Sequence, residues 1–128
     1  MTSSLYALLI LAMFNAVDEI NTASLVSYVK SLYNQDGSFN GDYAGEVDTR
    51  FSYCAVSILA LLNCLDQIDR GSVRDFVLRC KNIDGAFGGV PAAESHAAYV
   101  FTAVGTLKIL GETDLLDRDQ LGLWLSQR

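Results

Sequence analysis

Arg50 and His96 are the residues of this sequence whose types and positions most favour chemistry. Each lies where a long apolar helix is expected to begin, and His96 is the only histidine in the chain. The first turn of a helix carries free backbone N–H groups and the positive end of the helix dipole, so several such ends could hold a phosphate group. The spacing leaves a structural alternative open, in which Glu46 and Glu94 cap the helices and Arg50 pairs with a neighbouring acidic residue.

A repeat of 48 residues underlies these two helix starts. Shifting the sequence by 48 positions places residues 24–71 on residues 72–119 without a gap, and 16 of the 48 positions are identical. The same shift places residues 1–23 on residues 49–71. The chain is therefore about 2.7 copies of one unit, ending in a partial copy over residues 120–128, and such a fixed period indicates a stacked or circular array.

The first part of each unit is predicted to be a long helix that is apolar on most faces. It is expected over Asp48–Leu65, with equivalents over Ser4–Phe14 and Ser95–Leu110. A helix of this kind is buried on several sides. We therefore expect these three helices to form the inner layer of the array.

The second part of each unit is predicted to be an amphipathic outer helix. Its apolar residues follow the i, i+3, i+4, i+7 spacing of a helix with one buried face, and Ser24 and Ser72 stand where N-caps are expected. Glycine-rich loops over Asn34–Gly45 and Asn82–Ala93 then join one hairpin to the next. The sequence thus predicts an all-α array of helical hairpins.

Matched residues recur along the expected inner helices. Aromatic pairs occupy equivalent positions, and one small position is kept in all three copies; the residues are Phe51/Tyr99, Tyr53/Phe101 and Ala7/Ala55/Ala103. Such a pattern could line an apolar tunnel, or it could pack a closed core. The pattern alone does not separate these two structures.

The composition narrows the classes of function. Hydrophobic residues make up 51% of the chain and charged residues 19%, which excludes a disordered chain. A net charge of −6 argues against nucleic-acid binding. Three cysteines without paired spacing indicate a reducing compartment, and the apolar stretch Leu5–Phe14 is too short to span a bilayer.

Two motifs, in order and inside this repeat, resemble the β subunits of protein prenyltransferases. The first is DGSF followed by GEVDTRFSYCA, over residues 36–55, and the second is NIDGAFG followed by ESHAA, over residues 82–98. The combination of GEVDTRF with ESHA is most similar to the Rab geranylgeranyltransferase (type II) β subunits. The resemblance covers nearly the whole chain and implies an α-α toroid, of which residues 1–128 would be an incomplete ring.

The resemblance also implies a site for an isoprenoid diphosphate. His96, Ala97 and Ala98 match the family segment that contacts geranylgeranyl diphosphate, and Arg50 matches a family arginine near the lipid. The implied wall of the lipid funnel comes from aromatic and aliphatic positions of the inner helices: Tyr53, Phe101, Tyr99 and Leu5.

Further implications concern the complete family enzyme. Its zinc is held by Asp, Cys and His from later repeats, expected beyond Arg128, so no catalytic or metal-binding residue is expected in this chain. The implied partners are an α subunit and a Rab GTPase with its escort protein, and the implied location is the cytoplasm. Two alternatives remain: a truncated non-catalytic paralogue that acts as a scaffold, and another α-α toroid enzyme such as a terpene cyclase.

The array itself predicts how the isolated chain behaves. A repeat buries its faces only against neighbouring repeats, so the repeats at the two ends are expected to leave apolar surface uncovered. We expect large exposed apolar patches and marginal solubility.

Overall fold

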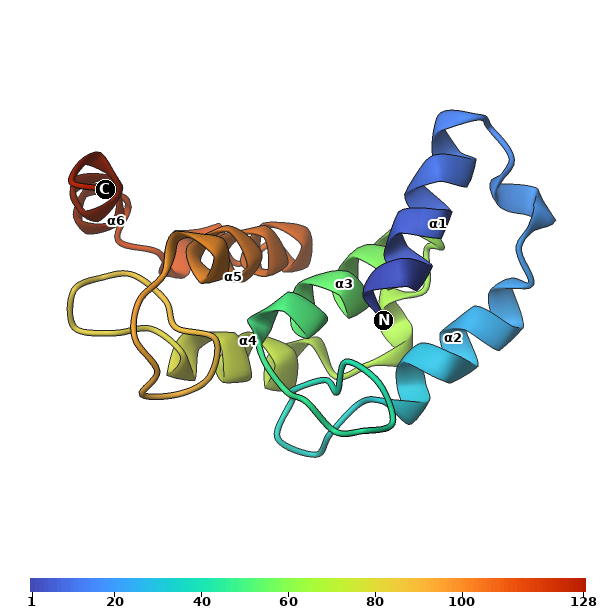
Figure 1. Ribbon diagram of the computed structural model, residues 1–128, viewed down its shortest axis with the longest axis horizontal. Coiled ribbons are helices and arrows are strands. Elements are labelled where there is room, and N and C mark those ends of the chain that lie inside the picture. Colours follow the sequence, from blue (N-terminus) through green and yellow to red (C-terminus); the bar gives the residue numbers. More distant parts are fainter.

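A computed structural model describes residues 1–128 as six α-helices, with no strands (Figure 1). The helices are α1 (Thr2–Met13), α2 (Thr22–Ser31), α3 (Thr49–Leu61), α4 (Arg70–Arg79), α5 (Ala97–Leu110) and α6 (Arg118–Ser126). A short 3-10 helix follows each inner helix, at Val17–Glu19, Leu65–Gln67 and Thr113–Leu115. The outer helices α2, α4 and α6 begin at intervals of 48 residues, so the sequence repeat is also a structural repeat.

The inner helix α3 lies at the centre of the array and packs against both α1 and α5 (Figure 1). Nine of its 13 residues are buried, and its core side chains include Val56, Ile58 and Leu59. One apolar cluster joins α1, α2 and α3, and a second joins α4, α5 and α6 around Phe87 and Trp124. The predicted division into buried inner helices and amphipathic outer helices is therefore confirmed, although α1 buries only Leu5 and Leu8.

The outer helices are capped three residues earlier than predicted. Asn21 Oδ1 accepts a hydrogen bond from the Ser24 N–H at 3.0 Å, and Asp69 Oδ1 accepts from the Ser72 N–H at 3.3 Å. The prediction of Ser24 and Ser72 as N-caps was wrong because each serine stands at the third helical position, where it donates to the true cap. Asp117 caps α6 in the same way.

The inner helix α3 ends at Leu61, four residues before the predicted Leu65, and α1 ends one residue before the predicted Phe14, whereas α5 ends at Leu110 as predicted. Asn15 and Asn63 take left-handed backbone angles with φ of 54°, and the equivalent Gly111 has φ of 82°. A residue in this conformation stops the helical hydrogen-bond ladder, and Gly or Asn adopts it at the least cost. The 3-10 turns then carry the chain to the outer helix.

The glycine loops bring consecutive hairpins into direct backbone contact. Gly37, with φ of 88°, has no room for a side chain because a Cβ there would overlap the backbone carbonyl of Ser72 in the next hairpin. The equivalent Gly85 lies against the Gln120 side chain, at 2.6 Å from its projected Cβ. A Trp124 Nε1–H hydrogen bond to Asp84 Oδ2 of 2.9 Å further ties α6 to the second loop. No helix combines the length and the hydropathy needed to cross a membrane.

Candidate functional site

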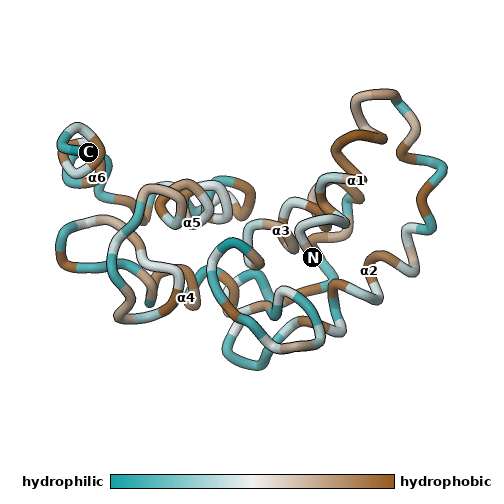
Figure 2. The backbone as a smooth tube through the Cα atoms, viewed as in Figure 1, coloured by the Kyte–Doolittle hydropathy of each residue, from teal (hydrophilic) through white to brown (hydrophobic).

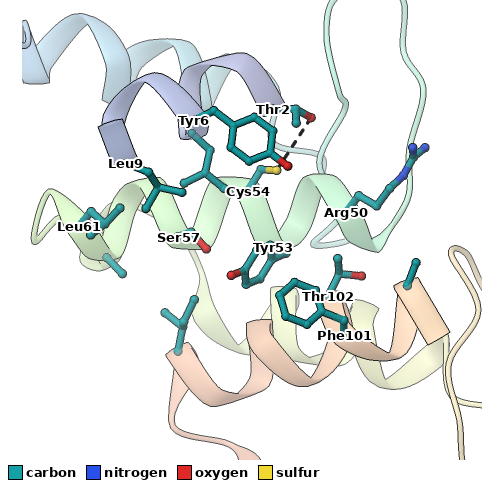
Figure 3. Close-up of a pocket in the computed structure, with 14 residues that line it drawn as sticks. Thr2, Tyr6, Leu9, Arg50, Tyr53, Cys54, Ser57, Leu61, Phe101 and Thr102 are labelled. Carbon is teal, nitrogen blue, oxygen red and sulfur yellow. Dashed lines mark hydrogen bonds between the residues drawn. The ribbon is translucent and has the colours of Figure 1, made fainter. Parts of the chain in front are cut away.

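An apolar cavity of about 900 Å³ lies between the three inner helices α1, α3 and α5 (Figure 3). Ten of the 14 residues that line it are hydrophobic. The lining residues are Thr2, Leu5, Tyr6, Leu9, Arg50, Tyr53, Cys54, Ser57, Ala60, Leu61, Ala98, Phe101, Thr102 and Ile109. The sequence pattern was compatible with either an apolar tunnel or a closed core. The structure shows a cavity beside a packed core.

The predicted wall residues Leu5, Tyr53 and Phe101 all line this cavity. The rings of Tyr53 and Phe101 meet edge to face, with their centroids 5.3 Å apart. This approach depends on Gly105, because a Cβ there would lie 2.7 Å from the Tyr53 ring. Tyr99, predicted for the same wall, does not line the cavity; its ring packs over Gly89 instead.

Two polar groups interrupt the apolar wall along α3. Ser57 is 8% exposed, and its Oγ has no hydrogen-bond partner. Burial raises the pKa of the Cys54 thiol, which lies 4.0 Å from Thr2 Oγ1. At neutral pH Cys54 is therefore a protonated, weakly polar part of the wall rather than a nucleophile.

Arg50 stands at one end of the cavity, and its guanidinium points away from the other lining residues (Figure 3). Its Nη2 lies 2.8 Å from Glu46 Oε1, and its Nε donates to both carboxylate oxygens of Asp48 at 3.0 Å. The hydrogen bond to Asp48 raises the pKa of Arg50 further above its ordinary value. The acidic pairing of Arg50 that the sequence left open is therefore present.

The first turn of α3 has no free N–H group for an anion. Asp48, rather than Glu46, caps the helix by accepting from the Arg50 N–H at 2.8 Å. The Thr49 N–H donates to the carbonyl of Gly89 in the next loop at 2.9 Å. Backbone bonding and the cap thus satisfy this helix start from within the chain.

The first turn of α5 is more open. His96, rather than Glu94, caps this helix, and its Nδ1 accepts from the Ala98 N–H at 3.1 Å. The Ala97 N–H is left without a partner, and both alanines are exposed. Of the predicted diphosphate residues, Ala98 and Arg50 line the cavity, whereas His96 and Ala97 lie outside its lining at the same helix start.

The predicted wall was incomplete, because Tyr6, Leu9 and Ser57 also line the cavity. Leu9 and Ser57 are equivalent in the repeat and stand one helical turn after Leu5 and Tyr53. Residues at i and i+4 share a helix face, so extending the repeat by one turn would have found both. Tyr6 carries a signal of the same kind, because its equivalents Cys54 and Thr102 also line the cavity.

The side chains of this chain do not form a zinc site. No group of three or more His, Cys, Asp or Glu residues is arranged so that it could hold a metal ion. The three cysteines are free: Cys54 and Cys80 are buried, Cys64 is half-buried, and burial raises the pKa of Cys80 to about 12.

Comparisons with known proteins agree with this architecture. The prenyltransferase alpha-alpha toroid domain matches residues 1–128. A solved structure of Candida albicans protein geranylgeranyltransferase-I complexed with GGPP superposes with a TM-score of 0.71 at 26% identity, over 86% of this chain and 35% of that one.

Curated relatives carry the name geranylgeranyl transferase type-2 subunit beta. The protein from Saccharomyces cerevisiae is 44% identical over 58 residues, which are 43% of this chain and 18% of the relative. The protein from Candida albicans is 58% identical over 33 residues, 26% of this chain and 10% of the relative. These matches span less than a fifth of the relatives' length. Because the domain match extends along the whole chain, the chain belongs to the prenyltransferase α-α toroid family.

Proposed function

We propose that this chain forms part of the isoprenoid-binding wall of a type II geranylgeranyltransferase β subunit. The reaction of the whole enzyme would transfer a geranylgeranyl group from its diphosphate to C-terminal cysteines of Rab GTPases. The observation that carries the proposal is the apolar cavity between α1, α3 and α5, with aromatic rings on its wall and an arginine at one end. The names of the curated relatives favour this activity over that of a terpene cyclase.

In this proposal the isoprenoid chain lies along the cavity, where Leu5, Tyr53 and Phe101 contact it. Each buried methylene contributes about 0.8 kcal/mol, so a long apolar chain gains most of its affinity from such a wall. The lipid covers apolar surface between the three helices that is otherwise open to water. The few polar groups on the wall add nothing to its affinity beyond what alkyl groups would.

The diphosphate lies at the Arg50 end of the cavity, close to the start of α5. The free Ala97 N–H and the helix dipole of α5 favour an anion there. Arg50 would contribute by exchanging its exposed contact with Glu46 for the ligand, while Asp48 keeps the guanidinium in place. His96 holds the turn in shape through its bond to the Ala98 N–H.

The remaining parts of the reaction belong to the complete enzyme. As the family resemblance implies, a zinc ion would activate the acceptor thiol, an α subunit would complete the heterodimer, and an escort protein would present the Rab GTPase in the cytoplasm. This chain would supply binding surface and no catalytic residue. A non-catalytic scaffold would share the same cavity, so lipid binding is tested before transfer.

The direct test is calorimetric titration of the 128-residue chain with geranylgeranyl diphosphate. Ala60 lines the cavity, and Ala60→Phe fills part of it. We expect Ala60→Phe to weaken binding at least about tenfold, since the ring takes space that the lipid needs. The matched control is Ala44→Phe, which adds the same ring in an exposed loop.

Inorganic diphosphate serves as the second ligand in the same titration. The proposal requires that it bind far more weakly than the lipid diphosphate. Absence of saturable lipid binding, or equal binding by Ala60→Phe and the wild type, would refute the cavity as the lipid site.

A further inference from the structure

Gly105 is a glycine in the middle of the inner helix α5. Figure 2 shows this helix as hydrophobic or neutral along most of its length. Glycine destabilises a helix interior relative to alanine, because it loses more conformational freedom on folding. The backbone of Gly105 follows the regular helix, so no unusual backbone angle requires a glycine there. The reason for this residue must lie in what surrounds it.

The ring of Tyr53 from α3 fills the space beside Gly105. A Cβ on Gly105 would lie 2.7 Å from Tyr53 Cε2 and 2.9 Å from Tyr53 Cδ2, and real Cβ atoms are essentially never that close to a neighbour. The ring lies between α3 and α5 on the wall of the cavity (Figure 3). The missing side chain therefore lets the ring lie closer to α5 and farther from the centre of the cavity.

The repeat shows how Gly105 differs from its equivalents. Leu9 and Ser57 occupy the same position in the first two inner helices, and both line the cavity with their own side chains. Gly105 does not line the cavity, because the Tyr53 ring lies where its side chain would be. This position of α5 thus shapes the cavity through a residue of the neighbouring helix.

We propose that Gly105 determines which lipid chains the cavity accepts, by keeping it wide enough for a methyl-branched prenyl chain. The inference rests on the proposed function. A side chain at this position would push the Tyr53 ring away from α5, from 2.7 Å to an ordinary contact of 3.4 Å, which is a retreat of about 0.7 Å. Because Tyr53 lies on the cavity wall, the retreat carries its ring toward the lipid. Gly105 is thus a positioning residue that acts through Tyr53.

Width distinguishes a prenyl chain from a straight alkyl chain. A prenyl chain carries a methyl branch on every isoprene unit, whereas an alkyl chain of the same backbone length is narrower. Closely packed apolar contacts respond to the size of a single methyl group. A wall that moves toward the lipid therefore excludes the branched chain before it excludes the straight one.

Calorimetric titration of the 128-residue chain with two ligands tests the proposal. Geranylgeranyl diphosphate carries the methyl branches, and hexadecyl diphosphate has the same backbone length without them. Gly105→Ala adds only one methyl group to α5. We expect it to raise the Kd for geranylgeranyl diphosphate about tenfold and the Kd for hexadecyl diphosphate less than about threefold.

Two controls separate this effect from a general change in a helix. Gly122→Ala makes the same substitution in α6, where a Cβ meets nothing within 4 Å, so both Kd values should stay unchanged. Tyr53→Leu removes the ring that Gly105 accommodates. In a Tyr53→Leu chain, Gly105→Ala should no longer change the ratio of the two Kd values, because the two residues act together.

Three results would overturn the proposal. The first is a Gly105→Ala chain that binds both ligands equally more weakly, or both as well as the wild type does. The second is a change in the Kd ratio that persists in the Tyr53→Leu chain. The third is a Gly105→Ala chain that does not fold by circular dichroism, which would show that the ring cannot yield. Absence of geranylgeranyl diphosphate binding by the wild type would refute the proposed function itself, and this inference with it.

Discussion

The starts of α3 and α5 are equivalent in the repeat, but their N-cap residues are chemically different. At α3 the cap is the carboxylate of Asp48, which is 5% exposed and held by the Arg50 guanidinium. At α5 the cap is the imidazole of His96, which is exposed and has no acidic partner. The cap at α3 is thus part of an ion pair, and the cap at α5 is not.

This difference teaches that a helix start is not an anion site by geometry alone. The N–H groups of both first turns have the same arrangement, but at α3 the cap and the Gly89 carbonyl use those that an anion would need. At α5 the Ala97 N–H remains free. The cap takes the second N–H at both starts, so the two ends differ in the first N–H, which a carbonyl of the following loop accepts at α3.

Removing the Asp48 cap of α3 is expected to have the largest effect on stability. Asp48→Ala removes the cap and the ion-pair partner of Arg50 together, and we expect a loss of about 2 to 3 kcal/mol in the free energy of unfolding. Asp48→Asn keeps an oxygen acceptor for the Arg50 N–H, and its loss should be about 1 kcal/mol. Urea unfolding followed by circular dichroism measures both. Equal losses would show that the cap bond contributes nothing.

Transplanting the closed start onto α5 sharpens the comparison. His96→Asp with Ala98→Arg recreates the Asp-x-Arg spacing of Asp48 and Arg50 at the open end. The new carboxylate opposes an anion at the Ala97 N–H, so the Kd for geranylgeranyl diphosphate should rise about tenfold. Calorimetric titration measures the change, with His96→Asn as a neutral-cap control. An unchanged Kd in the transplanted variant would remove the diphosphate from this end.

Removing the His96 cap of α5 is expected to have the smallest effect, again on stability. His96→Ala leaves the Ala98 N–H without its acceptor and should cost about 1 kcal/mol in the free energy of unfolding. His96→Asn should restore most of the loss, because asparagine is a good N-cap. Thermal unfolding of the three proteins checks this order. A His96→Asn protein as unstable as His96→Ala would show that the imidazole acts through something other than the cap.

The repeat made most of the fold predictable, because residues that are 48 positions apart occupy equivalent surroundings. It predicted the hairpins, the buried inner helices and three wall residues of the cavity. It did not predict the caps, since Ser24 and Ser72 are good cap types that stand three residues inside Asn21 and Asp69. The matched series Asn21, Asp69 and Asp117 was present in the sequence and would have given the correct positions.

The sequence could not predict which aromatic side chains face the cavity when another packing site lies within reach of the ring. Tyr99 was expected beside Phe101 on the wall, but the absence of a side chain at Gly89 gives its ring a closer partner. The exposure of Tyr6 likewise depends on what lies beside α1 and not on its own helix. The predicted apolar exposure is confirmed at both ends of the array.

Gly37 permits the close approach of one hairpin to the next. Because its missing side chain lets the loop rest directly on the Ser72 carbonyl, the separation of the two outer helix starts is set by backbone atoms. A larger residue at this position would push the loop away from Ser72 and separate the two hairpins there. We expect the width of the apolar cavity to depend on this position, although Gly37 does not line it.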